Sequence, residues 1–134
     1  MSVFSNSTAN AKFSDLALLL LRLQVGLLLL THGYPKLVNF TDRMERFADP
    51  FGLGPTISLA LVVFAEVLCS LLLIVGWKVR FAAIPIIITM LVVIFYAHWD
   101  DPFGRKELPI MFLVSSVVLF LTGPGKYSVE GIRT

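Results

Sequence analysis

The chain has 134 residues, of which 57% are hydrophobic and 15% are charged, and its formal net charge is +2. A soluble domain usually carries about 25% charged residues. The composition therefore excludes a disordered chain, a soluble enzyme of ordinary composition and a nucleic-acid-binding domain. The length allows one domain. The single cysteine, Cys69, excludes a disulfide within the chain, a cysteine-ligated iron–sulfur cluster and a CxxC redox pair.

Four apolar stretches follow one another, at about residues 15–33, 56–76, 81–99 and 107–122. A lipid core of about 30 Å needs about 20 helical residues, with a range of about 17–25. The first three stretches fit this length, and the fourth is slightly short. The sequence therefore predicts an all-α membrane protein, with a four-transmembrane-helix bundle running up-down-up-down over residues 15–122. A polar N-terminal segment, 1–14, precedes the bundle, and a C-terminal tail, 123–134, follows it.

Two alternatives for the apolar stretches are not favoured. A soluble four-helix bundle needs charged faces at helical spacing, but residues 56–65 and 81–96 hold no charge. A cleaved signal peptide is not favoured because the first stretch contains Arg22 and no small-x-small cleavage site follows it. The long connection 34–55 has mixed charge, and it can form a short interfacial helix with Met44, Phe47 and Phe51 facing lipid.

An even number of spans places both termini on the same side of the membrane. Lysines and arginines are evenly divided between the two sides, so the positive-inside rule alone gives no orientation. Lys78 and Arg80, however, lie in a tight turn, where the rule applies best, and most acidic residues lie on the opposite side. We therefore expect a bacterial inner-membrane protein with both termini in the cytoplasm.

Two opposite charges interrupt the first two spans. Arg22 lies about ten residues before the end of the first span and Glu66 about ten residues after the start of the second, so both would be about 15 Å deep. Because a lone charge at that depth is costly, we expect an Arg22–Glu66 ion pair. Such a pair is either a clamp that fixes helix register or a site for a proton, an anion or a quinone-like head group. The residues Gly26, Leu29, Gly33 and Lys36 follow Arg22 on one helical stripe.

A polar cluster is expected at one membrane face. The first and third spans run parallel, so His32 and His98 end at the same face. Lys36, Asp100 and Glu107 belong to that face as well. The cluster is either an interfacial belt with helix caps, a metal site or a proton-exchange site at a quinone mouth. A metal is not favoured because the two histidines lack a local ligand spacing, and a bis-histidine haem is less favoured still.

These residues together resemble the DoxX family of small four-helix membrane proteins. The resemblance rests on Arg22-x3-Gly26-x5-His32-Gly33-x2-Lys36, on Glu66, His98 and Glu107, and on the closing Gly123-Pro124-Gly125-Lys126-Tyr127-Ser128. It implies a bacterial inner-membrane protein, and it links the chain to the membrane subunit of thiosulfate:quinone oxidoreductase and to membrane-associated oxidoreductase complexes.

Three functions fit these features. The first is an anchoring or quinone-docking subunit of a larger oxidoreductase assembly, in which Arg22 and Glu66 line a cleft and His32 and His98 handle protons. The second is a non-catalytic membrane scaffold that binds partner proteins or further copies of itself. The third is an oligomeric small-solute transporter, which is less favoured because no inverted repeat with broken helices is visible.

Overall fold

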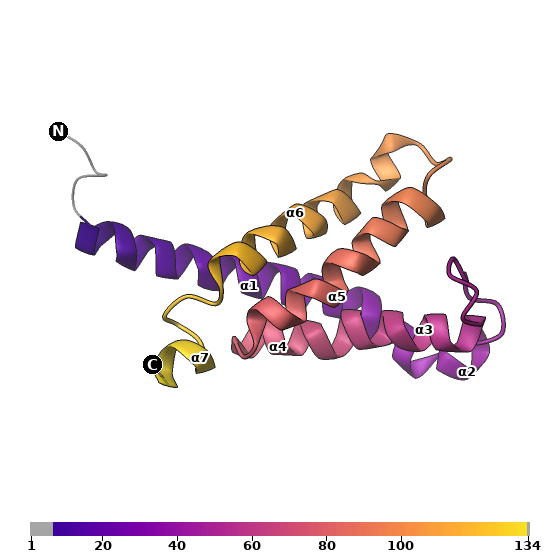
Figure 1. Cartoon of the computed structure of the whole chain (residues 1–134), viewed down its shortest axis with the longest axis horizontal. Coiled ribbons are helices and arrows are strands. Elements are labelled where there is room, and N and C mark those ends of the chain that lie inside the picture. Colours follow the sequence, from indigo (N-terminus) through magenta and orange to yellow (C-terminus); the bar gives the residue numbers. More distant parts are fainter. Residues whose placement is uncertain (1–6, 134) are drawn as a thin grey trace.

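The computed structural model describes residues 7–133, and every regular element in that range is a helix (Figure 1). The α-helices are α1 (Ser7–Val38), α2 (Phe40–Arg43), α3 (Pro55–Val63), α4 (Cys69–Val75), α5 (Val79–Val92), α6 (Glu107–Thr122) and α7 (Val129–Arg133). Two π-helical turns, η2 (Phe64–Leu68) and η3 (Val93–Ala97), and one 3-10 turn, η4 (Phe103–Arg105), complete the set. Since η2 joins α3 to α4 and η3 extends α5, the chain forms four main helices.

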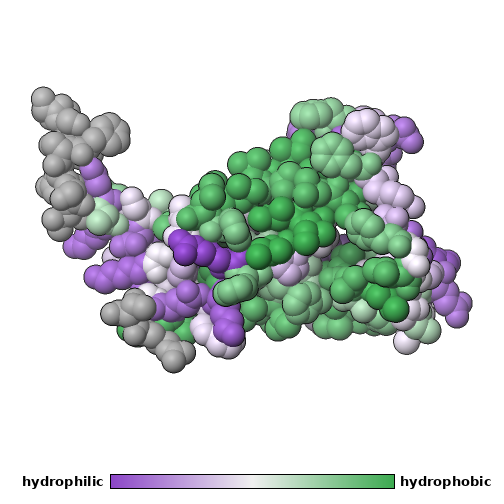
Figure 2. Space-filling view, viewed as in Figure 1, coloured by the Kyte–Doolittle hydropathy of each residue, from purple (hydrophilic) through white to green (hydrophobic). Residues whose placement is uncertain are grey.

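Three of these helices are long and apolar enough to cross a membrane. They cover Asn10–Val38, Pro55–Val75 and Val79–Ala97, with 29, 21 and 19 residues. The fourth, α6, is apolar and shorter, with 16 residues. Figure 2 shows a hydrophobic belt across the middle of the molecule and hydrophilic residues towards both ends. Large apolar side chains such as Phe81, Leu121 and Phe95 are exposed on this surface, as expected of helices that face lipid.

Helix α1 is longer at both ends than the predicted 15–33. It begins at Ser7, within the predicted polar segment, of which residues 1–6 lie outside the described range. It ends at Val38 and passes through Pro35. A proline inside a helix lacks the nitrogen hydrogen-bond donor and its ring crowds the carbonyl one turn earlier, and α1 ends within one turn after Pro35. The N-terminal half of α1 therefore projects beyond the helices beside it (Figure 1).

Glycines bring α1 close to the second span. A β-carbon placed on Gly33 would lie 2.7 Å from the β-carbon of Glu66 and 2.8 Å from its backbone carbon. A β-carbon on Gly26 would lie 2.9 Å from the carbonyl oxygen of Ser70. These glycines therefore set the spacing between the two backbones, as small residues do in membrane helix pairs.

Gly33→Ala is expected to lower the free energy of unfolding by about 1–3 kcal/mol, because backbone atoms of Glu66 must shift to admit the methyl group. Unfolding in mixed detergent micelles, followed by circular dichroism, measures this loss. Gly104→Ala is the matched control, since nothing lies within 4 Å of its added methyl group. Equal stability of the two variants would contradict the close approach.

The core lies where α1, α4, α5 and α6 meet. Its fully buried members include Leu29, Leu73, Ile86 and Leu119. Cys69 belongs to the same cluster and fills space there. Helix α5 packs along α6, and α1 packs along η2 and α4. In Figure 1 the α5–α6 pair diverges from α3 towards the end that carries α2, and the cavities described next lie at that end.

Candidate functional site: a charged pair between two cavities

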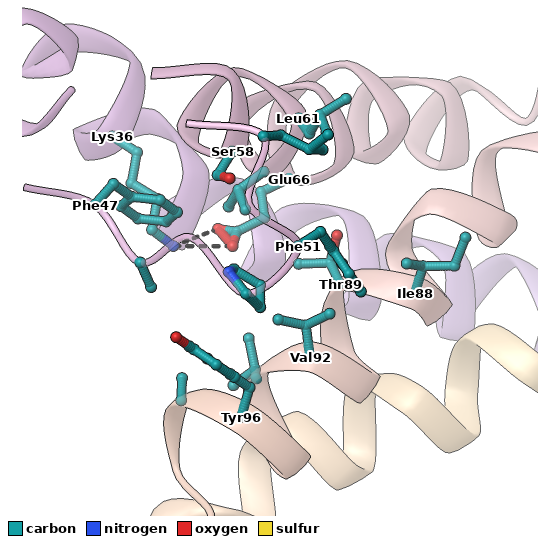
Figure 3. Close-up of a pocket in the computed structure, with 16 residues that line it drawn as sticks. Lys36, Phe47, Phe51, Ser58, Leu61, Glu66, Ile88, Thr89, Val92 and Tyr96 are labelled. Carbon is teal, nitrogen blue, oxygen red and sulfur yellow. Dashed lines mark hydrogen bonds and ion pairs between the residues drawn. The ribbon is translucent and has the colours of Figure 1, made fainter. Parts of the chain in front are cut away.

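An apolar cavity of about 160 Å³ lies between α3, the end of α5 and the α2–α3 connection (Figure 3). Apolar side chains form most of its wall, including Phe47, Phe51, Val92 and Tyr96. The charged groups in the wall are Lys36 and Glu66. A mostly apolar pocket with a few convergent polar groups is the usual form of a small-molecule site.

Glu66 is paired with Lys36. The lysine Nζ lies 2.9 Å from Oε1 and 2.8 Å from Oε2 of the carboxylate. The side chain of Glu66 is 4% exposed and that of Lys36 is 21% exposed. Figure 3 shows the two side chains reaching towards each other from α1 and η2. The buried Glu66 carboxylate is therefore paired with a lysine that is itself partly exposed.

The predicted Arg22–Glu66 ion pair is wrong. Within the described residues, Glu66 binds Lys36, and Arg22 binds backbone carbonyl oxygens at the far end of α4. The prediction assumed that Arg22 and Glu66 lie at the same depth in their two helices, and they do not. In the structure Gly33 rather than Arg22 lies against Glu66, near the middle of the second span, and Arg22 lies opposite the last turn of α4.

Arg22 is fully buried and caps α4. Its Nη1 donates to the carbonyl oxygens of Leu73, at 2.9 Å, and Ile74, at 3.4 Å, and its Nη2 donates to that of Tyr127. The last carbonyls of a helix have no partner within the helix, and a cation is favourable at that end. The Glu130 carboxylate adds electrostatic attraction for Arg22.

The C-terminal tail makes further contacts beside Arg22. We call Arg22, the end of α4 and the tail segment that they bind the latch. The Glu130 nitrogen donates to the carbonyl oxygen of Gly76 at 3.1 Å, and the Val79 nitrogen donates to Oε1 of Glu130 at 2.9 Å. Gly76 has a φ of 77°, and a β-carbon there would collide with Ser128 and Arg22. The tail is thus bound to the α4–α5 turn. Sequence reasoning noted the closing Gly-Pro-Gly motif but missed this contact.

A second cavity, of about 400 Å³, adjoins the first. The two cavities share six lining residues, which are Lys36, Glu66, Phe47, Ala48, Val93 and Ala97. The second one also brings together His32, His98 and Arg105. Asp100 and Glu107, which were expected in the same cluster, are exposed and lie outside both linings.

The two histidines have different neighbours. His32 packs edge-on against Phe112, with ring centroids 6.0 Å apart. His98 Nδ1 lies 2.6 Å from Oδ2 of Asp101. Within the described part of the chain, no three His, Cys, Asp or Glu residues are grouped as a metal site would require.

The hydrogen bond from His98 holds the pKa of Asp101 below its usual range. A lowered carboxyl pKa means that the bond contributes fully above the usual aspartate range and is lost as the pH falls through the lowered value. We therefore expect Asp101 to stay ionised into acid solution. Replacing His98 with glutamine should raise its titration midpoint, as followed by carboxyl carbon NMR. An unchanged midpoint would contradict the bond.

The α2–α3 connection covers the first cavity. The predicted interfacial helix is reduced to the single turn α2, and Phe47 and Phe51 line the cavity (Figure 3). Asp49 holds the connection in shape by accepting hydrogen bonds from the Leu53 and Gly54 nitrogens and the Ser58 hydroxyl, each at 2.9 Å. Phe47, in a connection of mixed charge, therefore helps to close the first cavity.

Two π-helical turns border the site, and sequence reasoning missed both. Glu66 lies within η2, and η3 supplies Val93, Tyr96 and Ala97 to the cavity walls. A π-turn inserts an extra residue and is frequent at functional sites. No proline or glycine lies in either turn, so hydrophobic pattern and helix-breaking residues give no signal for them.

Comparison with known proteins agrees with this architecture. Residues 17–99 match the DoxX family. The chain belongs to the DoxX family. The matched region contains Arg22, Lys36, Glu66 and His98, and thus both the latch arginine and the charged pair. No solved structure matches.

Two curated relatives of this DoxX chain are similar to it along most of its length. "Inner membrane protein YphA" of Escherichia coli is 29% identical over 122 residues, which cover 84% of this chain and 87% of that protein. An uncharacterized protein of Haemophilus influenzae is 29% identical over 96 residues, which cover 68% of this chain and 64% of that protein. The DoxX chain is thus a membrane protein, similar to a protein named for the inner membrane.

Proposed function

We propose that the first cavity binds the head group of a quinone-class molecule and that the chain is the quinone-docking subunit of a larger oxidoreductase assembly. The observation that carries this proposal is the charged pair Lys36–Glu66 in the wall of an apolar cavity at membrane depth. Ionisable residues inside a membrane are expensive and mark functional sites more often than surface charges do.

The lining chemistry suits a ring with polar oxygens. The Lys36 ammonium has three donors, two of which bind Glu66, and it can also donate to a carbonyl oxygen. The Glu66 carboxylate accepts a hydrogen bond from a hydroxyl. Phe47, Phe51 and Tyr96 supply aromatic surface around an apolar ring. A bound quinone would supply the electron chemistry, and these residues would bind and orient it.

The second candidate is a scaffold without a ligand. It is favoured by the mutual neutralisation of Lys36 and Glu66, since a satisfied pair can act as a clamp alone. In that case the cavity has no ligand and the pair only fixes how α1 meets η2.

Blocking the cavity separates the two candidates. Val92 lines the cavity, so Val92→Trp should abolish binding of a short-chain benzoquinone to the full chain in lipid nanodiscs. Leu91→Trp adds the same ring at the neighbouring position, where the side chain is 39% exposed and outside the lining, and should leave binding unchanged. Calorimetric titration measures both. Absence of binding by the parent chain, or equal binding by both variants, would contradict docking in this cavity.

We also propose that α6 completes a four-transmembrane-helix bundle with both termini in the cytoplasm. The start of α1, the α4–α5 turn and α7 lie at one end of the molecule in Figure 1. Lys78 and Arg80 flank that turn. Reporter fusions test this orientation: a fluorescent protein at the C-terminus should fold, and alkaline phosphatase there should be inactive. The reverse pattern would contradict it.

A further inference from the structure

The second cavity leads from the charged pair towards the membrane surface at His98 and Arg105. We propose that this cavity is a hydrated passage in which protons move between the Glu66 carboxylate and the surface, with His98 as the exchanging group at the outer end. The inference extends the proposed function, because a quinol bound at Lys36–Glu66 would need an outlet for its proton. Its tests, however, are carried out without any quinone.

The lining is polar enough to hold water. The cavity of about 400 Å³ has room for several water molecules, each of which takes about 30 Å³ in the liquid. A buried water needs two to four polar partners. The wall offers the imidazoles of His32 and His98, the Lys36 ammonium, the Glu66 carboxylate and the Arg105 guanidinium. By contrast, the first cavity has only Lys36 and Glu66 as charged lining groups.

His98 is arranged for proton exchange. Its Nδ1 is bound to Asp101 at 2.6 Å, which leaves Nε2 as the exchanging nitrogen. Its side chain is 33% exposed, so the ring has contact with both the cavity and solvent. The ionised Asp101 stabilises the imidazolium that forms when Nε2 takes up a proton. Imidazole is the side chain whose charge normally changes between pH 5 and 8.

Charged groups of both signs lie around His98 and the second cavity. Arg105 from η4 and Lys36 from α1 oppose a positive imidazolium, while Asp101 and Glu66 favour it. His32 on α1 is the remaining titratable group in the lining, and the residues that α6 contributes are the apolar Leu108, Pro109 and Phe112.

The transfer conserves one proton and moves no electrons. A hydroxyl bound at the pair gives its proton to the Glu66 carboxylate and is left as an oxyanion beside the Lys36 ammonium. The Glu66 acid then passes the proton through water to His98 Nε2. His98 then releases the proton to solvent. Glu66 is again a carboxylate and pairs with Lys36, as in the structure.

Cysteine labelling tests whether the passage is hydrated. Met90 lines the second cavity only and is 4% exposed, whereas Val114 on α6 is 57% exposed outside both linings. In a Cys69→Ala background, Met90→Cys should react with a charged, membrane-impermeant methanethiosulfonate at least about tenfold faster than Val114→Cys, because thiolates form in water. An unreactive Met90→Cys, or faster labelling of Val114→Cys, would show that the passage is dry and overturn the proposal.

Infrared spectroscopy tests whether His98 carries the proton. In Lys36→Met the isolated Glu66 carboxylate should take up a proton after a downward pH jump, giving a carboxylic-acid band that disappears in Lys36→Met/Glu66→Gln. Adding His98→Phe should slow the band's appearance at least about tenfold. Phe95→Leu, in the π-turn η3 that precedes His98 but outside both linings, should not change the rate. Equal rates with and without His98 would refute the passage.

These results are separable from the docking proposal. A chain that binds no benzoquinone but protonates Glu66 through His98 would retain the passage and refute quinone docking. A chain that binds benzoquinone with protonation independent of His98 would retain docking and refute the passage.

Discussion

Arg22→Ala will lower the free energy of unfolding by about 3–5 kcal/mol, one of the two largest losses we expect from replacing a charged residue in this chain. The guanidinium is fully buried and binds the carbonyl oxygens of Leu73, Ile74 and Tyr127. Its removal leaves the end of α4 without its cap and weakens the attachment of the tail, which then depends on the contacts of Glu130 with the α4–α5 turn. Unfolding in mixed micelles measures the loss, and limited proteolysis should cut the chain after residue 122.

The matched control for this variant is Arg80→Ala. Arg80 lies at the same end of the molecule, is exposed, and makes one long hydrogen bond, 3.4 Å to the Leu121 carbonyl oxygen. Its removal should change stability by no more than about 0.5 kcal/mol. If Arg22→Ala were as mild as Arg80→Ala, the latch would contribute little and the account of the tail would be wrong.

The second large effect is expected at the charged pair, and it is asymmetric. Lys36→Met leaves Glu66, which is 4% exposed, as a buried charge without its partner, at a cost of about 3–5 kcal/mol. Glu66→Gln leaves Lys36, which is 21% exposed and able to extend to the surface, at a cost of about 1–2 kcal/mol. Chemical unfolding of both variants in mixed micelles tests this order.

The double variant Lys36→Met/Glu66→Gln serves as the control for that pair. It removes both charges at once and should regain stability to within about 1 kcal/mol of the parent, because buried ion pairs are often replaceable by neutral groups. A double variant as unstable as Lys36→Met alone would mean that the lysine acts through packing rather than through its charge.

Much of the fold was predictable because long apolar stretches in a sequence are a strong signal for membrane-spanning helices. The sequence predicted four apolar helices, and the structure contains helices over each run. The ends were less predictable, since Ser7 and Val38 lie beyond the apolar run of α1. Hydrophobicity marks where lipid begins, but a helix continues into water for as long as its residues permit.

The charged pair was half predicted. Arg22, Gly26, Gly33 and Lys36 were correctly placed on one stripe, and the structure shows the stripe facing the second span. Choosing Arg22 as the partner of Glu66 failed because counting residues from the ends of two apolar runs does not give the register in which the two helices pack. Gly33 rather than Arg22 lies against Glu66, so Lys36, one turn beyond Gly33, is the cation within reach, and Arg22 lies about four turns away from Lys36.

The remaining features depend on tertiary packing. The tail segment around Tyr127 docks through backbone atoms, which any sequence possesses, so composition gives no sign of the contact. The π-turns around Glu66 and Tyr96 have ordinary helical residues. Phe47 and Phe51 were both assigned to lipid, but an apolar residue in a loop has the same pattern whether it faces lipid or a cavity. Both line the first cavity, and Phe51 is also 66% exposed, as a lipid-facing residue would be.

The most direct test of the central claim, that Lys36 and Glu66 serve a ligand as well as the fold, is benzoquinone binding by the double variant Lys36→Met/Glu66→Gln in nanodiscs. We predict a chain that folds with near-parental stability and binds at least about tenfold more weakly, because a charge-assisted hydrogen bond contributes about 1.5–3 kcal/mol. Binding at parental affinity would contradict the claim and leave the pair as a structural clamp.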